Sequence, residues 1–315
     1  MTRVRAVGTV GRRRTAGAVG WARATAAAAL VALVTACGAG ADASPPRPPA
    51  PAATGAAPTA GPGPASTPPS PAVTLPRPGA PFEYQLGGAD APEAGTEVVV
   101  RDATAAPSGR YDVCYVNGFQ SQPGDTDRLL RATPELVLHD DGEPVADPDW
   151  PDEVLLDVST PALRERLVAE LVGPLLDRCA AAGSDAVEVD NLDSWTRSHG
   201  LLDAEDAVAF TALLVERAHA HGLAYAQKNA AEVTDRVRAL GADLVVAEDC
   251  ARWDECATYT DAYPVVLDVE YDADAFAPAC AAQRDPATAL PGLSLVLRDL
   301  DVLPRGARGA VHAAC

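Results

Sequence analysis

The sequence predicts an α/β fold, namely a single-domain (β/α)8 barrel of the TIM type, and three observations favour it. The second half of the chain alternates short apolar segments with helical patterns, as parallel βαβ units do. About eight strands fit into the 234 residues from Phe82 to Cys315, close to the roughly 250 residues of a typical barrel of this type. No glycine-rich phosphate-binding motif follows a strand, which argues against an open nucleotide-binding sheet.

The predicted helices are recognised by their ends. One begins at Thr160-Pro161, because Thr is a good N-cap and Pro is favoured at the first helical position. Apolar residues follow at four-residue spacing, Pro174 predicts a kink, and Gly183 predicts the end of the helix. A second helix is predicted from Asp203 to Gly222 and a third over residues 231–240. Strands are predicted at residues 82–86, 97–100, 113–116, 186–190, 223–227, 244–248, 265–270 and 293–297.

The first 81 residues are predicted to lie outside the barrel. Residues 1–36 contain six arginines, no acidic residue and a short apolar run, which is the pattern of a secretory signal peptide. Val34-Thr-Ala-Cys37 is similar to the bacterial lipobox, so we expect Cys37 to be lipidated and to anchor the chain at the outer face of the cell membrane. An ordinary signal peptide with a chance Cys nearby is the alternative. Residues 37–81, rich in Pro, Ala and Gly, are predicted to be a disordered linker.

The charge of the chain restricts its partners. The formal net charge is -19, and it becomes -25 once the six arginines of the signal peptide are removed. This charge argues against nucleic acid and anionic membrane surfaces as partners. It favours a cationic ligand, although an acidic surface that serves solubility explains it equally well. We expect a monomer.

Six cysteines follow Cys37, an even number, and export would place them in an oxidising compartment where disulfides are expected. Six cysteines allow fifteen pairings. Cys250 and Cys256 are the favoured pair because they close a short loop, and a bond between Cys280 and Cys315 would hold the C-terminus. The spacing matches no C-x2-C motif and no His lies nearby, so a metal site is not expected.

Polar residues follow the ends of four successive predicted strands. These are Asp190-Asn191, Lys228-Asn229, Glu248-Asp249 and Glu270-Tyr271. Because barrel enzymes have their active sites at the carboxyl ends of the strands, we expect these groups to share one mouth. Lys228 is the only lysine in the chain, and an ammonium can donate to a sugar hydroxyl or hold a carboxylate ionised. A chance Lys on a loop is the alternative.

Glycoside hydrolysis needs one ionised carboxylate and one carboxylic acid on either side of the bond. Asp190 and Glu248 are the best pair, because each ends a strand and they lie two strands apart. Glu188 lies two residues before Asp190, so it shares the same side of the strand. Any one of these acids could instead be a helix N-cap or a solvated loop end.

In their order along the chain, these motifs resemble glycoside hydrolase family 114, the endo-α-1,4-polygalactosaminidase-like barrels. The resemblance covers essentially residues 82–315 and rests on seven segments. They are Phe82-Glu-Tyr-Gln-Leu86, Cys114-Tyr115 with Gly118, Trp150-Pro151 through Leu156-Asp157, Glu188-Val-Asp-Asn191, Lys228-Asn229, the Glu248-x-Cys250-x5-Cys256 loop and Val269-Glu270-Tyr271.

The resemblance implies a retaining hydrolase of an α-1,4-linked galactosamine polymer, with Asp190 as nucleophile, Glu248 as acid/base and no metal or organic cofactor. The residues expected at the substrate are Glu188, Asn191, Lys228, Asn229, Glu270, Tyr271 and Tyr84. The chain departs from the family where Val189 replaces the usual Pro. It also has Ala247-Glu-Asp-Cys250 where the family usually has Asn-Glu-Gln-Cys, which leaves the exact glycan open.

Two other functions remain possible. A non-catalytic glycan-binding lipoprotein with the same barrel would share an aromatic groove with the enzyme, and the candidates for that groove are Trp195, Tyr225, Trp253 and Tyr271. Only the enzyme requires Asp190 and Glu248 at catalytic separation. A metal-dependent barrel hydrolase is less favoured, because the histidines lie away from the predicted strand ends.

Overall fold

The computed structural model describes residues 72–122 and 124–315. The predicted signal peptide, Cys37 and most of the predicted linker lie outside the described residues. The last ten residues of that linker, 72–81, pack on the barrel. Ala80 is buried and its carbonyl accepts a hydrogen bond from the Ser294 hydroxyl at 2.8 Å. The Tyr111 hydroxyl donates to the carbonyl of Thr74 at 2.8 Å, so ordered chain begins before the first strand.

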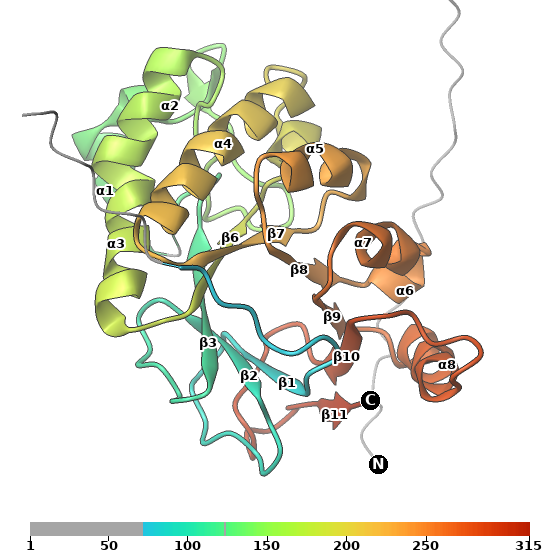
Figure 1. The fold of residues 1–315 in the computed structure, drawn as a ribbon. Helices are drawn as coiled ribbons and strands as arrows, with labels where there is room; N and C mark the ends of the chain where they lie inside the picture. The colour runs from blue at the N-terminus through green and yellow to red at the C-terminus, as the bar shows by residue number, and fades with distance from the viewer. Residues whose placement is uncertain (1–71, 123) are drawn as a thin grey trace, which may run out of the picture. The chain divides into compact units, whose positions relative to one another are not determined.

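Nine strands form one sheet at the centre of the fold (Figure 1). In sheet order they are β1 (Phe82–Gln85), β2 (Val98–Asp102), β3 (Tyr111–Asn117), β6 (Ala186–Asp190), β7 (Ala224–Lys228), β8 (Leu244–Glu248), β9 (Val266–Glu270), β10 (Leu293–Arg298) and β11 (His312–Ala314). The first eight pair in parallel and β11 runs antiparallel to β10. All eight predicted strands are present, with ends within two residues of those predicted.

The helices lie in the later connections between strands. They are α1 (Thr126–Ala132), α2 (Pro161–Leu167), α3 (Gly173–Ala182), α4 (Ala204–Ala220), α5 (Thr234–Ala239), α6 (Cys250–Trp253), α7 (Cys256–Ala262) and α8 (Ala273–Arg284). Short helical turns occur at Pro134–Leu136, Val168–Val172, Ser194–Arg197 and Ala231–Val233, and a small hairpin is formed by β4 (His139–Asp140) and β5 (Glu143–Pro144).

The sheet is barrel-like, but it departs from the predicted (β/α)8 pattern in two ways. The described connections from β1 to β2 and from β2 to β3 contain no helix, so loops and β11 surround this part of the sheet (Figure 1). The strands β1 and β10 lie side by side without sharing a ladder of backbone hydrogen bonds. The Ser294–Ala80 bond crosses this seam instead.

The helix ends follow the sequence signals. Thr160 caps α2 by accepting from the N–H of Leu163, and Gly183, with φ of 90°, ends α3. Asp203 and Asp206 form a capping box at α4. Between α2 and α3 the helix widens into a π-helical segment, Val168–Val172, just before Pro174. Pro174 has no N–H to donate, so a regular helix would lack one backbone hydrogen bond at this point.

Two apolar cores and three disulfides hold these elements in place. One core fills the barrel and includes Tyr84, Val100 and Leu267, whereas the other lies between the sheet and the helices. Both predicted disulfides are present, Cys250–Cys256 between α6 and α7 and Cys280–Cys315 between α8 and the C-terminus. A third, Cys114–Cys179, joins β3 to α3.

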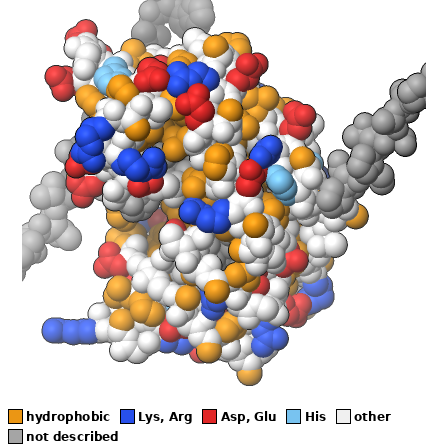
Figure 2. Space-filling view, turned by 90° about the vertical axis from the view of Figure 1, so that its left-hand side faces the viewer, with side chains coloured by type: hydrophobic (Ala, Val, Ile, Leu, Met, Phe, Trp, Pro, Cys, Tyr) orange, Lys and Arg blue, Asp and Glu red, His pale blue; other side chains and the backbone are white. Residues whose placement is uncertain are grey.

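The face formed by α1, α2 and α3 carries mixed charge. In its upper half, Arg and acidic side chains lie beside one another (Figure 2). Exposed ion pairs on these helices include Arg166–Glu170 at 2.7 Å and Arg128–Asp125 at 2.7 Å. Exposed pairs of this kind contribute little stability. Among the described helices, none is both long and apolar enough to cross a bilayer.

Candidate active site

A cavity of about 500 Å³ lies at the carboxyl ends of the strands. Eight carboxylate side chains line it, and they are Asp102, Asp147, Asp149, Glu153, Asp190, Asp193, Glu248 and Asp301. Arg197 is the only basic side chain among its lining residues. Walls of one sign concentrate the electric field, so this cavity attracts cationic groups. Trp150, which is 58% exposed, and Tyr271 add aromatic surface to the lining.

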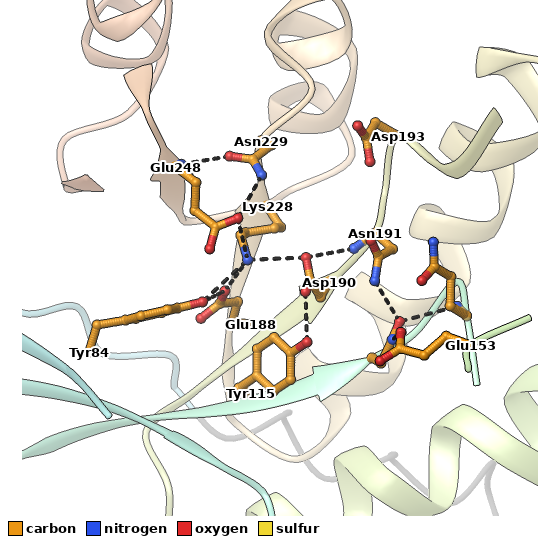
Figure 3. Close-up of polar contacts among 12 residues, drawn as sticks. Tyr84, Tyr115, Glu153, Glu188, Asp190, Asn191, Asp193, Lys228, Asn229 and Glu248 are labelled. Atoms are coloured by element: carbon orange, nitrogen blue, oxygen red, sulfur yellow. Dashed lines mark hydrogen bonds and ion pairs between the residues drawn. The ribbon is translucent and has the colours of Figure 1, made fainter. Parts of the chain in front are cut away.

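Lys228 lies directly beneath the cavity at the end of β7, and three carboxylates surround its ammonium (Figure 3). Its Nζ lies 2.9 Å from Glu188 Oε1, 3.1 Å from Asp190 Oδ1 and 3.4 Å from Glu248 Oε2. Burial by itself would lower the pKa of Lys228, but the three carboxylates raise it well above its ordinary value. The ammonium therefore remains charged and ties the ends of β6, β7 and β8 together.

Glu188 forms the floor of the cluster. Its side chain is fully buried, and Oε1 accepts from the Tyr84 hydroxyl at 2.9 Å as well as from Lys228. Burial raises the pKa of Glu188 to about 7, with Lys228 opposing and Asp190 adding to the shift. In this geometry neither Glu188 nor Lys228 lines the cavity, so both support the site from below. Direct contact of either residue with substrate stays a prediction.

Asp190 is held rigidly at the end of β6. Oδ1 accepts from Lys228 and, at 2.8 Å, from the backbone N–H of Asn191, whereas Oδ2 accepts from the Tyr115 hydroxyl at 2.7 Å. Burial would raise the pKa of Asp190, but Lys228 and these hydrogen bonds hold it below its ordinary value. Asp190 is therefore ionised at neutral pH.

Glu248 faces Asp190 across the cavity from the end of β8. The Tyr271 hydroxyl donates to its Oε1 at 2.6 Å, and the Asn229 amide donates to Oε2 at 3.4 Å. The side-chain oxygen Oδ1 of Asn229 also accepts from the Glu248 backbone N–H at 2.7 Å, which fixes the end of β8. Since Asp190 Oδ1 and Glu248 Oε2 lie 3.1 and 3.4 Å from one nitrogen, they can be no more than about 6.5 Å apart.

A second polar network borders the cavity beyond Asp190. The Asn191 amide donates to Asn117 at 3.0 Å, and Asn117 in turn donates to Glu153 Oε2 at 2.7 Å. Arg197 donates to Asn191 at 2.9 Å and pairs with Asp147 at 2.7 Å. Burial, together with the charge of Asp190, raises the pKa of Glu153 to about 7, although its bond from Asn117 opposes the shift.

Not every predicted site residue reaches the cavity. Glu270 is fully buried on the outer face of β9, because side chains alternate along a strand and the neighbouring Tyr271 takes the inner face. Among the proposed groove aromatics only Tyr271 lines the cavity. Tyr225 is buried in the core, Trp195 packs against it and Trp253 is 61% exposed on α6.

Sequence reasoning did not assign Tyr115, Asn117, Glu153 or Arg197 to the site. Tyr115 could have been found, since it lies opposite Glu188 in the β3–β6 ladder. Glu153 lies in an irregular connection and Arg197 ends the single helical turn Ser194–Arg197, and neither is long enough in pattern to indicate the direction of a side chain.

The described residues offer one close group of metal-ligand types, namely Cys250, Cys256 and Asp268. Both sulfur atoms belong to one disulfide, so they are not available as thiolate ligands. This group therefore gives no reason to infer a metal centre.

The model of glycoside hydrolase family GH114 matches residues 63–315, which include the whole barrel and its site. The chain belongs to glycoside hydrolase family GH114. The resemblance of the sequence motifs to this family is therefore confirmed at the level of the family. A comparison with curated proteins found no match.

Two solved structures share the fold of this GH114 chain. The first is the Aspergillus fumigatus protein Ega3 in complex with galactosamine, which is 22% identical with a TM-score of 0.60 and covers 78% of this chain and 98% of its own. The other is the glycoside hydrolase domain of PelA from Pseudomonas aeruginosa. It is 15% identical with a TM-score of 0.52, and covers 75% of this chain and 98% of its own.

Proposed function

We propose that this GH114 chain hydrolyses an α-1,4-linked, galactosamine-containing polysaccharide by a retaining mechanism. The observation that carries the proposal is the pairing of Asp190 and Glu248 on one buried ammonium, at the mouth of a barrel. Asp190 Oδ1 and Glu248 Oε2 lie no more than about 6.5 Å apart. This upper limit allows the separation of roughly 5–5.5 Å found between the carboxyl groups of retaining enzymes, and it reaches only the lower edge of the inverting range.

In this mechanism Asp190 is the nucleophile, because Lys228 and Tyr115 keep it ionised and hold both of its oxygens. Asp190 attacks the anomeric carbon while Glu248 donates a proton to the departing glycosidic oxygen. Glu248, now ionised, then removes a proton from the water that releases the sugar from Asp190. The negative charge on Asp190 falls as its bond to the sugar forms, and the Lys228 ammonium then stabilises the new charge on Glu248.

The substrate class is supported by the charge of the cavity. Deacetylated galactosamine residues carry an ammonium group, and eight carboxylates line the cavity against one arginine. The fold neighbour Ega3 was crystallised with galactosamine. Trp150 offers an exposed ring at the cavity rim on which a sugar can stack.

The test compares the purified protein with Asp190→Asn and Glu248→Gln on partly deacetylated galactosamine polymers. We expect cleavage by the wild type and a loss of ~10³-fold or more in each variant, as for other covalent mechanisms that lose an essential group. Asp149→Asn, at an exposed position of the same cavity, is the matched control and should keep most of the activity.

A second candidate function is glycan binding without turnover, since the acidic cavity and Trp150 would serve it equally. If the wild type binds these polymers but releases no product, binding replaces hydrolysis as the function. If both variants cleave normally, the assignment of Asp190 and Glu248 is wrong. The anomeric configuration of the first product, followed by NMR, distinguishes retention from inversion.

We further propose that the mature protein is tethered at the outer face of the bacterial cell membrane through Cys37. This proposal rests on the lipobox-like Val34-Thr-Ala-Cys37, on the basic and apolar residues before it, and on the Pro-rich segment after it. A tethered hydrolase would act on polysaccharide at the surface of its own cell.

A further inference from the structure

Strand β9 carries two buried carboxyl groups on the face turned away from the cavity. Asp268 and Glu270 lie two residues apart, so they share this face, and both are 0% exposed. Among the described residues, no Lys, Arg or His forms an ion pair with either of them. Two unpaired carboxylates buried side by side are very unfavourable, because nothing offsets their desolvation and mutual repulsion.

Each carboxyl group uses one oxygen to hold the loop that follows β8, by which we mean Asp249 and the first two residues of α6, Cys250 and Ala251. Asp268 Oδ1 accepts from the backbone N–H of Cys250 at 3.1 Å, and Glu270 Oε1 accepts from that of Ala251 at 2.7 Å. The other two oxygens, Asp268 Oδ2 and Glu270 Oε2, are buried without a donor among the described residues. As alternate residues on one face of β9 the two side chains are neighbours, and a hydrogen bond between them raises the pKa of Asp268 and lowers that of Glu270. Since ionised carboxylates only accept, a hydrogen bond between them requires a proton.

The segment held in this way directly follows Glu248, the last residue of β8. Asp249 adopts a left-handed conformation with φ of 58°, its N–H donates to the Val269 carbonyl at 2.9 Å, and its Oδ1 accepts from the Tyr271 N–H at 3.0 Å. Together with the bonds at Cys250 and Ala251, the loop is tied to β9 at three consecutive residues. Tyr271, in turn, donates from its hydroxyl to Glu248.

The groups around the pair favour a retained proton. Burial, the largest influence, raises the pKa of both Asp268 and Glu270, and the charge of Asp249 raises both further. The backbone N–H groups oppose this shift but do not reverse it. The Cys250–Cys256 disulfide and Tyr259, from α6 and α7, are uncharged neighbours of the pair. Arg252 of α6 is charged, and its guanidinium pairs with Asp249 Oδ2 at 3.3 Å instead of with Asp268 or Glu270. The charged residues Asp274 and Arg284 of α8 lie in its first and last turns.

We propose that Asp268 and Glu270 share one proton and act as positioning residues for Glu248, by fixing the loop from Asp249 to Ala251. The structural part of this proposal stands on the contacts alone, and its consequence for turnover rests on the proposed function. Loss of the proton would place a second negative charge in the buried pair and release the loop. Activity and loop protection would therefore decline together at alkaline pH.

The test uses two substitutions of almost unchanged volume, singly and together. In Asp268→Asn or Glu270→Gln, one amide N–H takes the place of the shared proton, so the hydrogen bonds to Cys250 and Ala251 remain. In the double variant two amide NH2 groups face each other, and neither nitrogen can accept a hydrogen bond from the other. The readout is hydrogen exchange at the Cys250 and Ala251 amides, measured by NMR from mildly acidic to alkaline pH and corrected for intrinsic base catalysis.

We expect both single variants to keep these amides protected at every pH, the wild type to lose protection at alkaline pH, and the double variant to lose it throughout. Single variants that exchange as fast as the double variant would overturn the proposal, as would a wild type with the same pH response as the single variants.

On a polymer that the wild type cleaves, the double variant should lose ~10-fold in kcat with little change in KM. The hydrogen-exchange measurement needs no substrate. Its result can therefore be interpreted even if the protein does not cleave the polymers tested.

Discussion

Lys228 determines the charge balance of the site. One ammonium with 1% of its side chain exposed contacts Glu188, Asp190 and Glu248, which come from two different strands. Loss of the ammonium would leave the three carboxylates close together with nothing to offset their mutual repulsion. This explains why the single lysine of the chain stands here: a compact ammonium has three donors, and each can point at a different carboxylate.

Replacing Lys228 with Met should destabilise the fold and move the pH profile of any activity. We expect a loss of about 3–5 kcal/mol in the free energy of unfolding, the usual range for breaking a buried charge pair. Lys228 lowers the pKa of both Asp190 and Glu188, so the loss should be larger at alkaline pH, where both acids are ionised, and smaller in acid. The acidic limb of kcat/KM should shift to higher pH. Denaturant unfolding and rate measurements across pH check both effects.

The control for this prediction is the double variant Lys228→Met/Glu188→Gln. Removing the fully buried acid together with its counter-ion should restore part of the lost stability. A Lys228→Met protein as stable as the wild type at alkaline pH would show that the ammonium does not hold the cluster together.

Glu153 should make the stability of the protein depend on pH. Its pKa is raised to about 7 by burial and by Asp190, so the folded state keeps a proton that the unfolded chain releases near its ordinary value of 4.5. The stability contributed by this proton is present below that value and is lost as pH rises to about 7. Relative to the wild type, Glu153→Gln should therefore gain in Tm across this window and stay constant above it.

The matched control is Glu165→Gln on the exposed side of α2, which should show no such gain. A constant Tm difference between Glu153→Gln and the wild type across the window would contradict a raised pKa at Glu153.

At the scale of elements, the position of Asp190 depends on how β3 and β6 pack. Gly118 follows β3, and its N–H donates to the Asp190 carbonyl at 3.3 Å. A Cβ at Gly118 would collide with Cγ1 of the fully buried Val189. We predict that Gly118→Ala lowers the free energy of unfolding by about 1–3 kcal/mol through overpacking and also lowers activity by displacing the end of β6.

A double-mutant cycle tests this contact. Val189→Ala should destabilise by itself through a small cavity, but it should make room for the methyl group that Gly118→Ala adds. The two changes together should therefore cost less than their sum. Additive losses would mean that Gly118 is required for a reason other than Val189.

At the scale of the whole molecule, the N-terminal region should decide where the enzyme works. Cys37→Ser removes the sulfur that is predicted to carry diacylglycerol. We expect the wild type in the membrane fraction with fatty-acid label, and the variant in the soluble exported fraction without label. Ser44→Ala, in the predicted linker that follows Cys37, is the control. If the wild type and Cys37→Ser were distributed equally between the membrane and soluble fractions, the lipid anchor would be wrong and an ordinary cleaved signal peptide would be favoured.

The local chemistry of the sequence was sufficient for the order of strands, the main helix ends and two of the disulfides. Caps such as Thr160 and Asp203 act on backbone groups a few residues away, and Cys250 and Cys256 are close in the chain, so short patterns suffice for them. Asp190 and Glu248 could be identified because the carboxyl ends of parallel strands meet at one edge of a barrel.

Only the tertiary structure decided what each acid at that edge does. Glu270 was expected in the mouth, yet it faces the other side of β9 and holds the loop behind Glu248. Glu153, from an irregular connection, lies at the cavity instead. The pKa of Asp190 is lowered and that of Glu188 is raised, although both lie on the same strand, β6. These differences arise from burial and from distances between residues far apart in the chain, which no local pattern contains.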